Sequence, residues 1–187
     1  MKTERKNSVY RLTVGGLLLA IGIVIPRMFH MFGTPEIGKV FLPMHISVFI
    51  AGIYLGGYYG TLIGFITPLI NSLFGMPIFP FNVIMAFELA AYGLFAGLFM
   101  YLLQKRSAKW MGRTLRVYIS LILSMIAGRI INALVLFVMA RFFAMQVPAP
   151  FTVWGSAITG IPGIIIQLLL VPSIIFALYK AEGKHSR

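Results

Sequence analysis

The 187-residue chain contains no cysteine and no aspartate, and only four acidic residues stand against 16 lysines and arginines. Without cysteine, neither a disulfide framework nor a thiolate metal site can form. The three histidines lie far apart in the sequence, so no zinc site is predicted. Acid–base catalysis would have to rest on Glu88 and distant histidines, which is a weak basis for an enzyme.

Recognition motifs for nucleotides and for common hydrolytic chemistry are also missing from the sequence. There is no G-x-x-x-x-G-K-[ST] phosphate loop, so the chain is not predicted to hydrolyse ATP itself. G-x-S-x-G and H-E-x-x-H are absent as well. The sequence therefore predicts no catalytic residue, no metal and no cofactor.

Charged residues are few along the chain, and most of them flank the apolar runs. Charged residues make up 11% of the chain, against about 25% in soluble domains, and 59% of residues are hydrophobic. The net charge of +12 could also suit nucleic acid. Because the positive residues flank apolar runs, as at the cytoplasmic ends of membrane helices, the bilayer is the predicted partner and nucleic acid is not.

Six apolar runs approach or exceed the length of roughly 17–25 residues that crosses a bilayer as a helix. Barrel strands would be about ten residues long with alternating polarity. The sequence therefore predicts an all-α, multi-pass membrane protein, with residues 1–187 forming one bundle of six transmembrane helices. The predicted spans lie near residues 11–29, 40–57, 58–75, 81–103, 114–144 and 154–180.

Lysine and arginine gather in the N-terminal segment, in the connection after the fourth span and at the C-terminus. Positive residues accumulate on the cytoplasmic side of membrane proteins, and an even number of spans puts all three segments on that side. Both termini are thus predicted to be cytoplasmic. The opposite loops, near 30–39, 74–81 and 146–151, contain prolines that suit ordered turns. They are either plain connectors or a lid over a cavity open to the outside.

Glu88 and Arg129 are ionisable residues inside the fourth and fifth runs, where they are costly unless they face protein or a cavity. Counted from the inner ends of their spans, both lie roughly 20 Å above the inner surface at about 1.5 Å per residue. Equal depth predicts an ion pair between them. The pair either fixes helix register or lines a solute pocket, where the planar Arg129 guanidinium would bind a carboxylate.

Several uncharged polar residues accompany this pair in the apolar runs. Asn132 follows Arg129 by three residues on the same helix face, and Gln167 lies in the sixth run. His45, Asn71 and Asn82 fall in the outer halves of their runs, which is consistent with an outward-facing pocket. Alternatively, a single asparagine in a membrane helix often only joins helices. The predicted solute-binding residues are Arg129, Asn132, His45, Asn82, Asn71 and Glu88.

Small residues recur at helical spacing. Gly16 and Ala20 are four residues apart in the first run, which allows another helix to approach closely. The segments "AGIYLGG" and "AAYGLFAG" repeat the theme. Such faces serve either packing inside the bundle or, for the first helix, docking on another membrane subunit.

Four short motifs occur along the chain in the order "LPMHI", "MAFELAAYG", "AGRI" and "GIPGIIIQ". Gly60, Gly64 and Pro68 also form a G-x-x-x-G-x-x-x-P pattern. This order of motifs resembles that of the S components of energy-coupling factor (ECF) transporters. The resemblance covers nearly the whole chain. It implies a six-helix subunit of the bacterial plasma membrane that captures a vitamin from outside, beneath the loops after helices one and three. It also implies partners, namely an ECF transmembrane subunit and two ATPases. The docking face it implies matches Gly16 and Ala20, although the family usually has alanine at the first position.

Pantothenate-type S components are the nearest in pattern, and components for cobalamin, folate or riboflavin are the alternatives within the family. Outside it, the alternatives are a solitary carrier and a membrane-embedded enzyme that uses Glu88 and His45. No internal repeat is evident, although many carriers show one. The enzyme would need a nucleophile or metal that the sequence does not supply.

Overall fold

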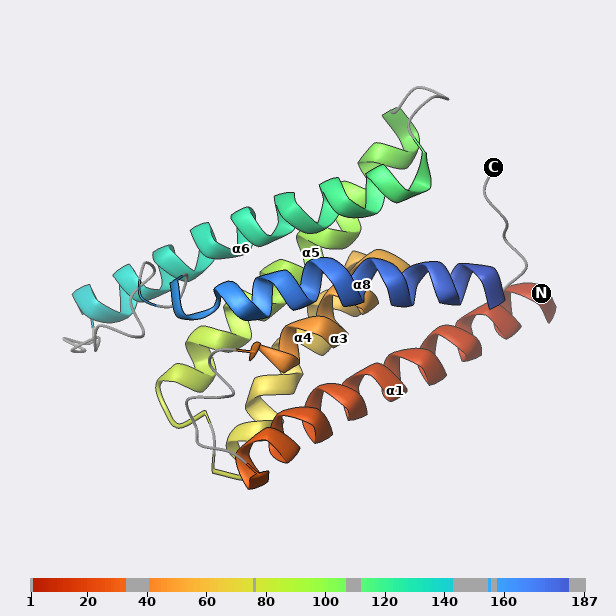
Figure 1. Cartoon of the computed structure of the whole chain (residues 1–187). Helices are drawn as coiled ribbons and strands as arrows, with labels where there is room; N and C mark the ends of the chain where they lie inside the picture. The colour runs from red at the N-terminus through yellow and green to blue at the C-terminus, as the bar shows by residue number, and fades with distance from the viewer. Residues whose placement is uncertain are drawn as a thin grey trace.

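The computed structural model describes residues 2–32, 41–75, 77–106, 112–142, 155 and 158–181, and every regular element in them is a helix. The all-α prediction is therefore confirmed for this part of the chain (Figure 1). In chain order the elements are α1 (Lys2–Phe32), α3 (Pro43–Ile50), the π-helical η1 (Ala51–Leu55), α4 (Gly57–Ser72), α5 (Phe81–Arg106), α6 (Arg113–Phe142) and α8 (Ile161–Ala181).

Four helices, α1, α5, α6 and α8, are long and apolar enough to cross a membrane. They correspond to the first, fourth, fifth and sixth predicted spans. The segments predicted as the second and third spans form shorter helices: Pro43–Leu55, and α4 with 16 residues. At about 1.5 Å per residue α4 reaches only about 24 Å, short of the roughly 30 Å hydrocarbon core.

A backbone break between η1 and α4 explains why these two helices are short. Gly56 has a φ of 106°, a conformation that glycine adopts readily and other residues do not. The break ends η1 at Leu55 and lets α4 begin at Gly57 in a new direction. Leu42, directly before α3, also has a positive φ, of 49°.

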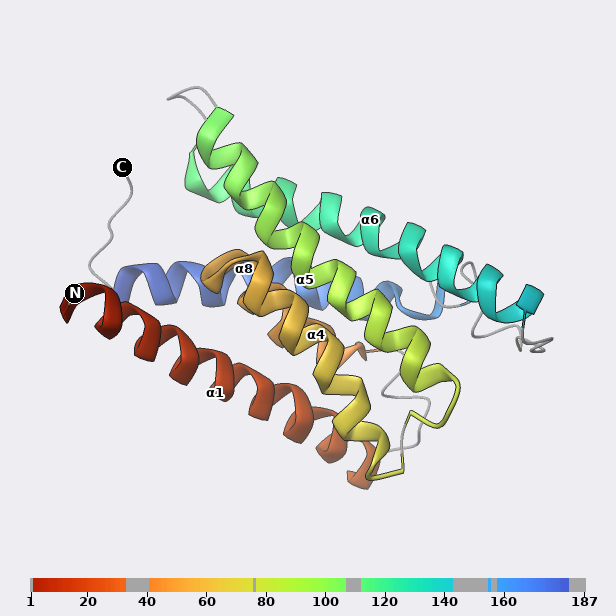
Figure 2. The same ribbon diagram turned by 180° about the vertical axis from the view of Figure 1, so that it is seen from behind.

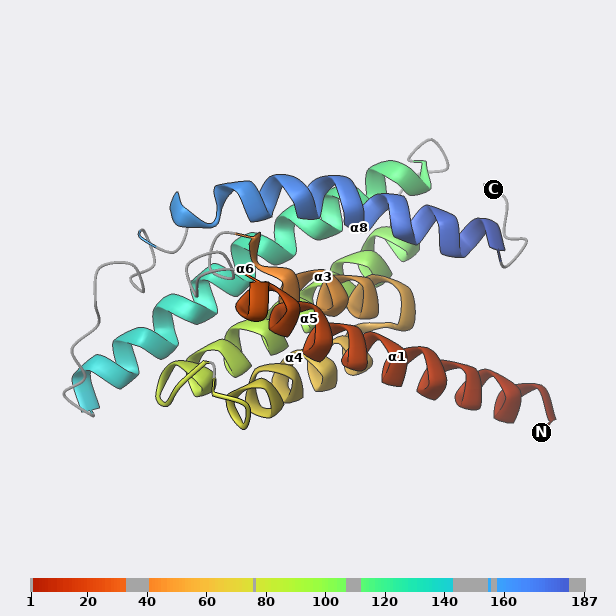
Figure 3. The same cartoon turned by 60° about the horizontal axis from the view of Figure 1, so that its bottom comes forward.

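The first of the short helices, Pro43–Leu55, lies at the centre of the bundle and is almost entirely buried, whereas α4 keeps one face exposed. Seen from behind, α4 and α5 run side by side, and α5 packs against both α4 and α6 (Figure 2). Figure 3 shows α3 enclosed among α1, α5 and α8, all of which it contacts. The largest fully buried apolar side chains come from four different helices: Phe49, Leu89, Leu121 and Ile175. The core thus joins α3, α5, α6 and α8.

Glycines bring η1, α4 and α5 to backbone contact. A Cβ added to Gly60 would lie 2.7 Å from both the Cα of Gly52 and the carbonyl oxygen of Gly93. A Cβ on Gly52 would lie 2.5 Å from the same Gly93 oxygen. Because real Cβ atoms do not approach backbone this closely, the "AGIYLGG" and "AAYGLFAG" segments serve packing inside the bundle.

Gly16 and Ala20 behave differently from these internal glycines. Both are exposed on α1, and a Cβ added to Gly16 would have no atom within 4 Å. On the same helix Gly15 is buried against Tyr59 of α4 instead. The Gly16–Ala20 face therefore takes no part in packing within the described bundle and points outward.

Candidate functional site

Glu88 is buried on α5 and binds three side chains. Its Oε1 accepts a hydrogen bond from the Tyr92 hydroxyl at 2.8 Å and lies 3.3 Å from Nη1 of Arg129. Its Oε2 accepts a hydrogen bond from Nδ2 of Asn132 at 2.7 Å. The ion pair predicted from equal depth is confirmed. The side chain of Glu88 is 7% exposed and that of Arg129 is 19% exposed, so the carboxylate lies deeper than the guanidinium.

Helical spacing assembles this cluster from two helices. Glu88 and Tyr92 are four residues apart on α5, and Arg129 and Asn132 are three apart on α6, so each pair shares one face. Gly128, directly before Arg129, lies against the Tyr92 ring, and a Cβ there would overlap that ring. The glycine of "AGRI" thus makes room for the tyrosine that binds Glu88.

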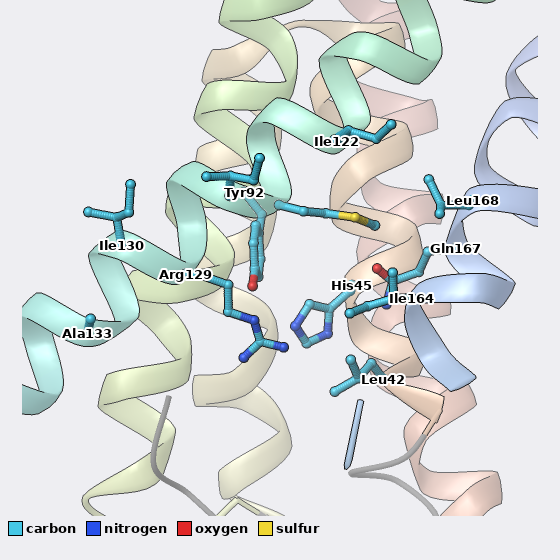
Figure 4. A pocket seen from close by; sticks show the side chains of 12 residues that line it. Leu42, His45, Tyr92, Ile122, Arg129, Ile130, Ala133, Ile164, Gln167 and Leu168 are labelled. Atoms are coloured by element: carbon cyan, nitrogen blue, oxygen red, sulfur yellow. The ribbon is translucent and has the colours of Figure 1, made fainter. Parts of the chain in front are cut away.

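Next to the cluster is a cavity of about 650 Å³ between α3, α5, α6 and α8 (Figure 4). Its size falls within the range of roughly 300–1,000 Å³ that is usual for small-molecule sites. Four polar side chains line it: His45, Tyr92, Arg129 and Gln167. The remaining wall is aliphatic or thioether, mostly from α6 and α8. Polar and apolar side chains therefore share the lining of the cavity, and both α6 and α8 contribute residues of each kind.

The polar side chains point into a common space. Figure 4 shows the Arg129 guanidinium directed toward the His45 imidazole, and Gln167 of α8 lies beside His45 on the side away from Arg129. His45 is 4% exposed and Gln167 is 1% exposed. Neither Nδ1 of His45 nor Nε2 of Gln167 has a hydrogen-bond partner among the described residues. Buried polar atoms are normally paired, so these two are suited to bind a solute.

The predicted binding residues divide into three groups. Arg129 and His45 line the cavity. Glu88 and Asn132 lie behind Arg129, and Oδ1 of Asn132 has no partner within the described segments. The structure does not bring Asn71 and Asn82 to this cavity, and their contacts are described next.

Asn71 and Asn82 join helices instead. Nδ2 of Asn71 donates to the carbonyl oxygens of Gly22 at 3.2 Å and Thr67 at 3.0 Å, which links α4 to α1. Nδ2 of Asn82 donates to Oγ of Ser72 at 3.2 Å, across the turn between α4 and α5. These contacts correspond to the alternative in which an asparagine holds membrane helices together.

Tyr92 and Gln167 line the cavity but are not among the predicted binding residues. A tyrosine in an apolar run is easily taken for part of the lipid-facing surface, and its spacing of four from Glu88 is the signal that identifies it. Gln167 is the most deeply buried polar residue of α8. Only the rotation of α8 shows that it faces the cavity.

The family model described as "ECF transporter, substrate-specific component" matches residues 10–175. The chain belongs to this family. Comparison with curated proteins and with solved structures gave no match. The resemblance found in the motifs is thus confirmed, and this substrate-specific component is a transporter subunit of a family that binds solutes. Family membership and the four long apolar helices together place it in a membrane.

Proposed function

We propose that this substrate-specific component captures a vitamin or related small solute from outside the bacterial plasma membrane for ATP-driven uptake, with pantothenate as the leading candidate. The observation that carries the proposal is the cavity of about 650 Å³ that Arg129, His45 and Gln167 line together with many apolar side chains. Pantothenate has a carboxylate at one end and two geminal methyl groups toward the other. A guanidinium binds carboxylates through two parallel hydrogen bonds, and the apolar wall suits the methyl groups.

Mass spectrometry of solute that co-purifies with the protein tests this proposal directly. We expect one small vitamin-like molecule, displaced by added pantothenate in detergent. Displacement by riboflavin, folate or cobalamin, with no effect of pantothenate, would assign the component to another vitamin. A purified, folded protein that retains and binds no small solute would contradict the proposal.

The proposed topology has six spans with both termini in the cytoplasm. It is supported by the clustered positive residues and by Figure 1, where the start of α1, the end of α8 and the α5–α6 end of the bundle lie on one side. Reporter fusions at Thr34 and Ala149 should report an exterior location, and one at Ser107 a cytoplasmic one. These three positions lie outside the described residues. An exterior signal at Ser107 would contradict the topology.

The proposed partners are an ECF transmembrane subunit and two ATPases, because the sequence contains no phosphate loop of its own. The exposed Gly16–Ala20 face of α1 is the proposed docking surface. A partner helix can approach closely there, since no side chain stands in the way.

Leucine at Gly16 or at Ala20 should therefore separate binding from transport. We expect solute binding in detergent to change less than about twofold, because the Gly16–Ala20 face lies outside the cavity wall. Uptake with the partner subunits should fall at least about tenfold, since a large side chain keeps the partner helix at a distance. Ala140→Leu, at an exposed position of α6, is the matched control. Loss of solute binding in the α1 variants would show that this face belongs to the solute site.

A further inference from the structure

Two of the polar side chains that line the cavity, Arg129 and Gln167, offer several hydrogen-bond donors. Arg129 carries a guanidinium with five N–H groups, and the primary amide of Gln167 carries two. Gln167 is 1% exposed, and its Nε2 has no hydrogen-bond partner in the described part of the chain. An unpaired buried donor costs free energy, which a solute with an acceptor group would recover on binding.

Acidic side chains do not line this cavity in the described segments. Within the described residues, the carboxylate of Glu88 lies behind Arg129 and is already bound to Tyr92, Asn132 and Arg129. Figure 4 shows the Arg129 guanidinium directed into the cavity. A cationic solute would meet a like charge there, whereas an anionic group would meet charged and neutral donors together.

The apolar part of the lining favours an aliphatic body. Ile122, Ile126 and Ile130 of α6 and Ile164 and Leu168 of α8 belong to it. Burial of apolar groups against such a wall is favourable by about 25 cal/mol per Å². Hydroxyl groups on that part of a solute, such as the two beside the methyl groups of pantothenate, would have to bind His45 or Tyr92 rather than these side chains.

We infer that the cavity selects solutes with a carboxylate head group on an aliphatic body, and that Gln167 is a specificity-determining residue that donates to this head group beside Arg129. The inference rests on the proposed function, because it takes this cavity as the solute site. It deepens that function by naming the chemical class of the solute and a residue on α8 that recognises it.

The test uses two probes that differ at one group: pantothenate, and pantothenol, in which a primary alcohol replaces the carboxylate. The purified wild-type protein should bind pantothenate at least about tenfold more tightly, as expected for hydrogen bonds to a charged acceptor. Gln167→Glu keeps the size of the side chain but places a negative charge beside the head group. We expect it to weaken pantothenate binding about 100-fold and pantothenol binding less than about fivefold.

Gln104→Glu, the same change at an exposed position of α5, is the control and should leave both affinities unchanged. If Gln167→Glu does not fold, Gln167→Leu provides the test. It should bind pantothenate about tenfold more weakly while its thermal unfolding midpoint is retained, because leucine removes the donor and keeps the volume. Equal losses for both probes in either variant, or no loss, would overturn the role of Gln167.

The outcome with a different natural solute is equally decisive. If another carboxylate-bearing solute co-purifies and Gln167→Glu weakens its binding, pantothenate is wrong and the inferred class is supported. If the wild-type protein instead binds thiamine or another cation, the inferred class is overturned while the proposed solute-binding function stands. Absence of any bound solute would overturn the proposed function and this inference with it.

Discussion

Replacing Gly93 with valine is expected to destabilise the protein by about 3 kcal/mol or more, the upper end for overpacked cores. A Cβ at Gly93 would overlap the carbonyl group of Gly60, and a backbone group cannot move aside as a flexible side chain can. The change therefore forces apart α4 and α5, which pack closely against each other. Unfolding by sodium dodecyl sulfate in mixed micelles would measure the loss.

Gly16→Val is the matched control for this prediction. A Cβ at Gly16 has no atom within 4 Å, and valine has a higher helix propensity than glycine. Its unfolding free energy should therefore stay within about 1 kcal/mol of wild type. Equal stability of Gly93→Val and Gly16→Val would mean that α4 and α5 do not meet at backbone distance.

The second large effect is expected at the Glu88–Arg129 pair. Glu88→Gln and Arg129→Gln should each destabilise the protein by about 3–5 kcal/mol, because each leaves a buried charge without its counter-charge. Nδ2 of Asn132 donates a hydrogen bond to Oε2 of Glu88. In Glu88→Gln one of the two carboxylate oxygens becomes an NH2 group, which cannot accept a hydrogen bond. The double variant should be destabilised by less than the sum, by a coupling of about 0.5–3 kcal/mol.

Tyr92→Phe calibrates this double-mutant cycle. It removes one hydrogen bond to Glu88 and keeps the ring, which packs 5.3 Å from the His45 ring and 5.2 Å from the Phe49 ring between centroids. A loss of about 1.5–3 kcal/mol is expected for one hydrogen bond to a charged acceptor. Strict additivity of the Glu88 and Arg129 changes would be incompatible with the 3.3 Å contact between them.

Depth along a helix is predictable from sequence because the rise per residue is fixed. For this reason counting residues from the inner ends of two spans was enough to pair Glu88 with Arg129. The all-α class followed in the same way from run length. The ECF family followed from the order of short motifs, of which "AGRI" has a structural reason in the contact between Gly128 and Tyr92.

Residue counting does not fix the rotation of a helix about its axis. The site predictions are therefore least complete where this rotation determines whether a side chain faces the cavity. Asn71 and His45 share the outer half of the bundle in sequence terms, yet Asn71 binds the Gly22 carbonyl while His45 lines the cavity. Gln167 is directed at the cavity by the rotation of α8. By contrast, the break at Gly56 lies close to the predicted boundary between the spans 40–57 and 58–75, because that boundary depends on position along the chain and not on rotation.

We propose that this substrate-specific component binds its solute alone but needs an ATPase module to accumulate it. The most direct measurement is uptake of radiolabelled pantothenate, or of the solute that co-purifies, into vesicles containing ATP, with and without the ECF transmembrane subunit and two ATPases. We expect solute binding by the chain alone, no accumulation above the external concentration, and concentrative uptake once the module and ATP are present. Concentrative uptake by the chain alone would contradict this proposal.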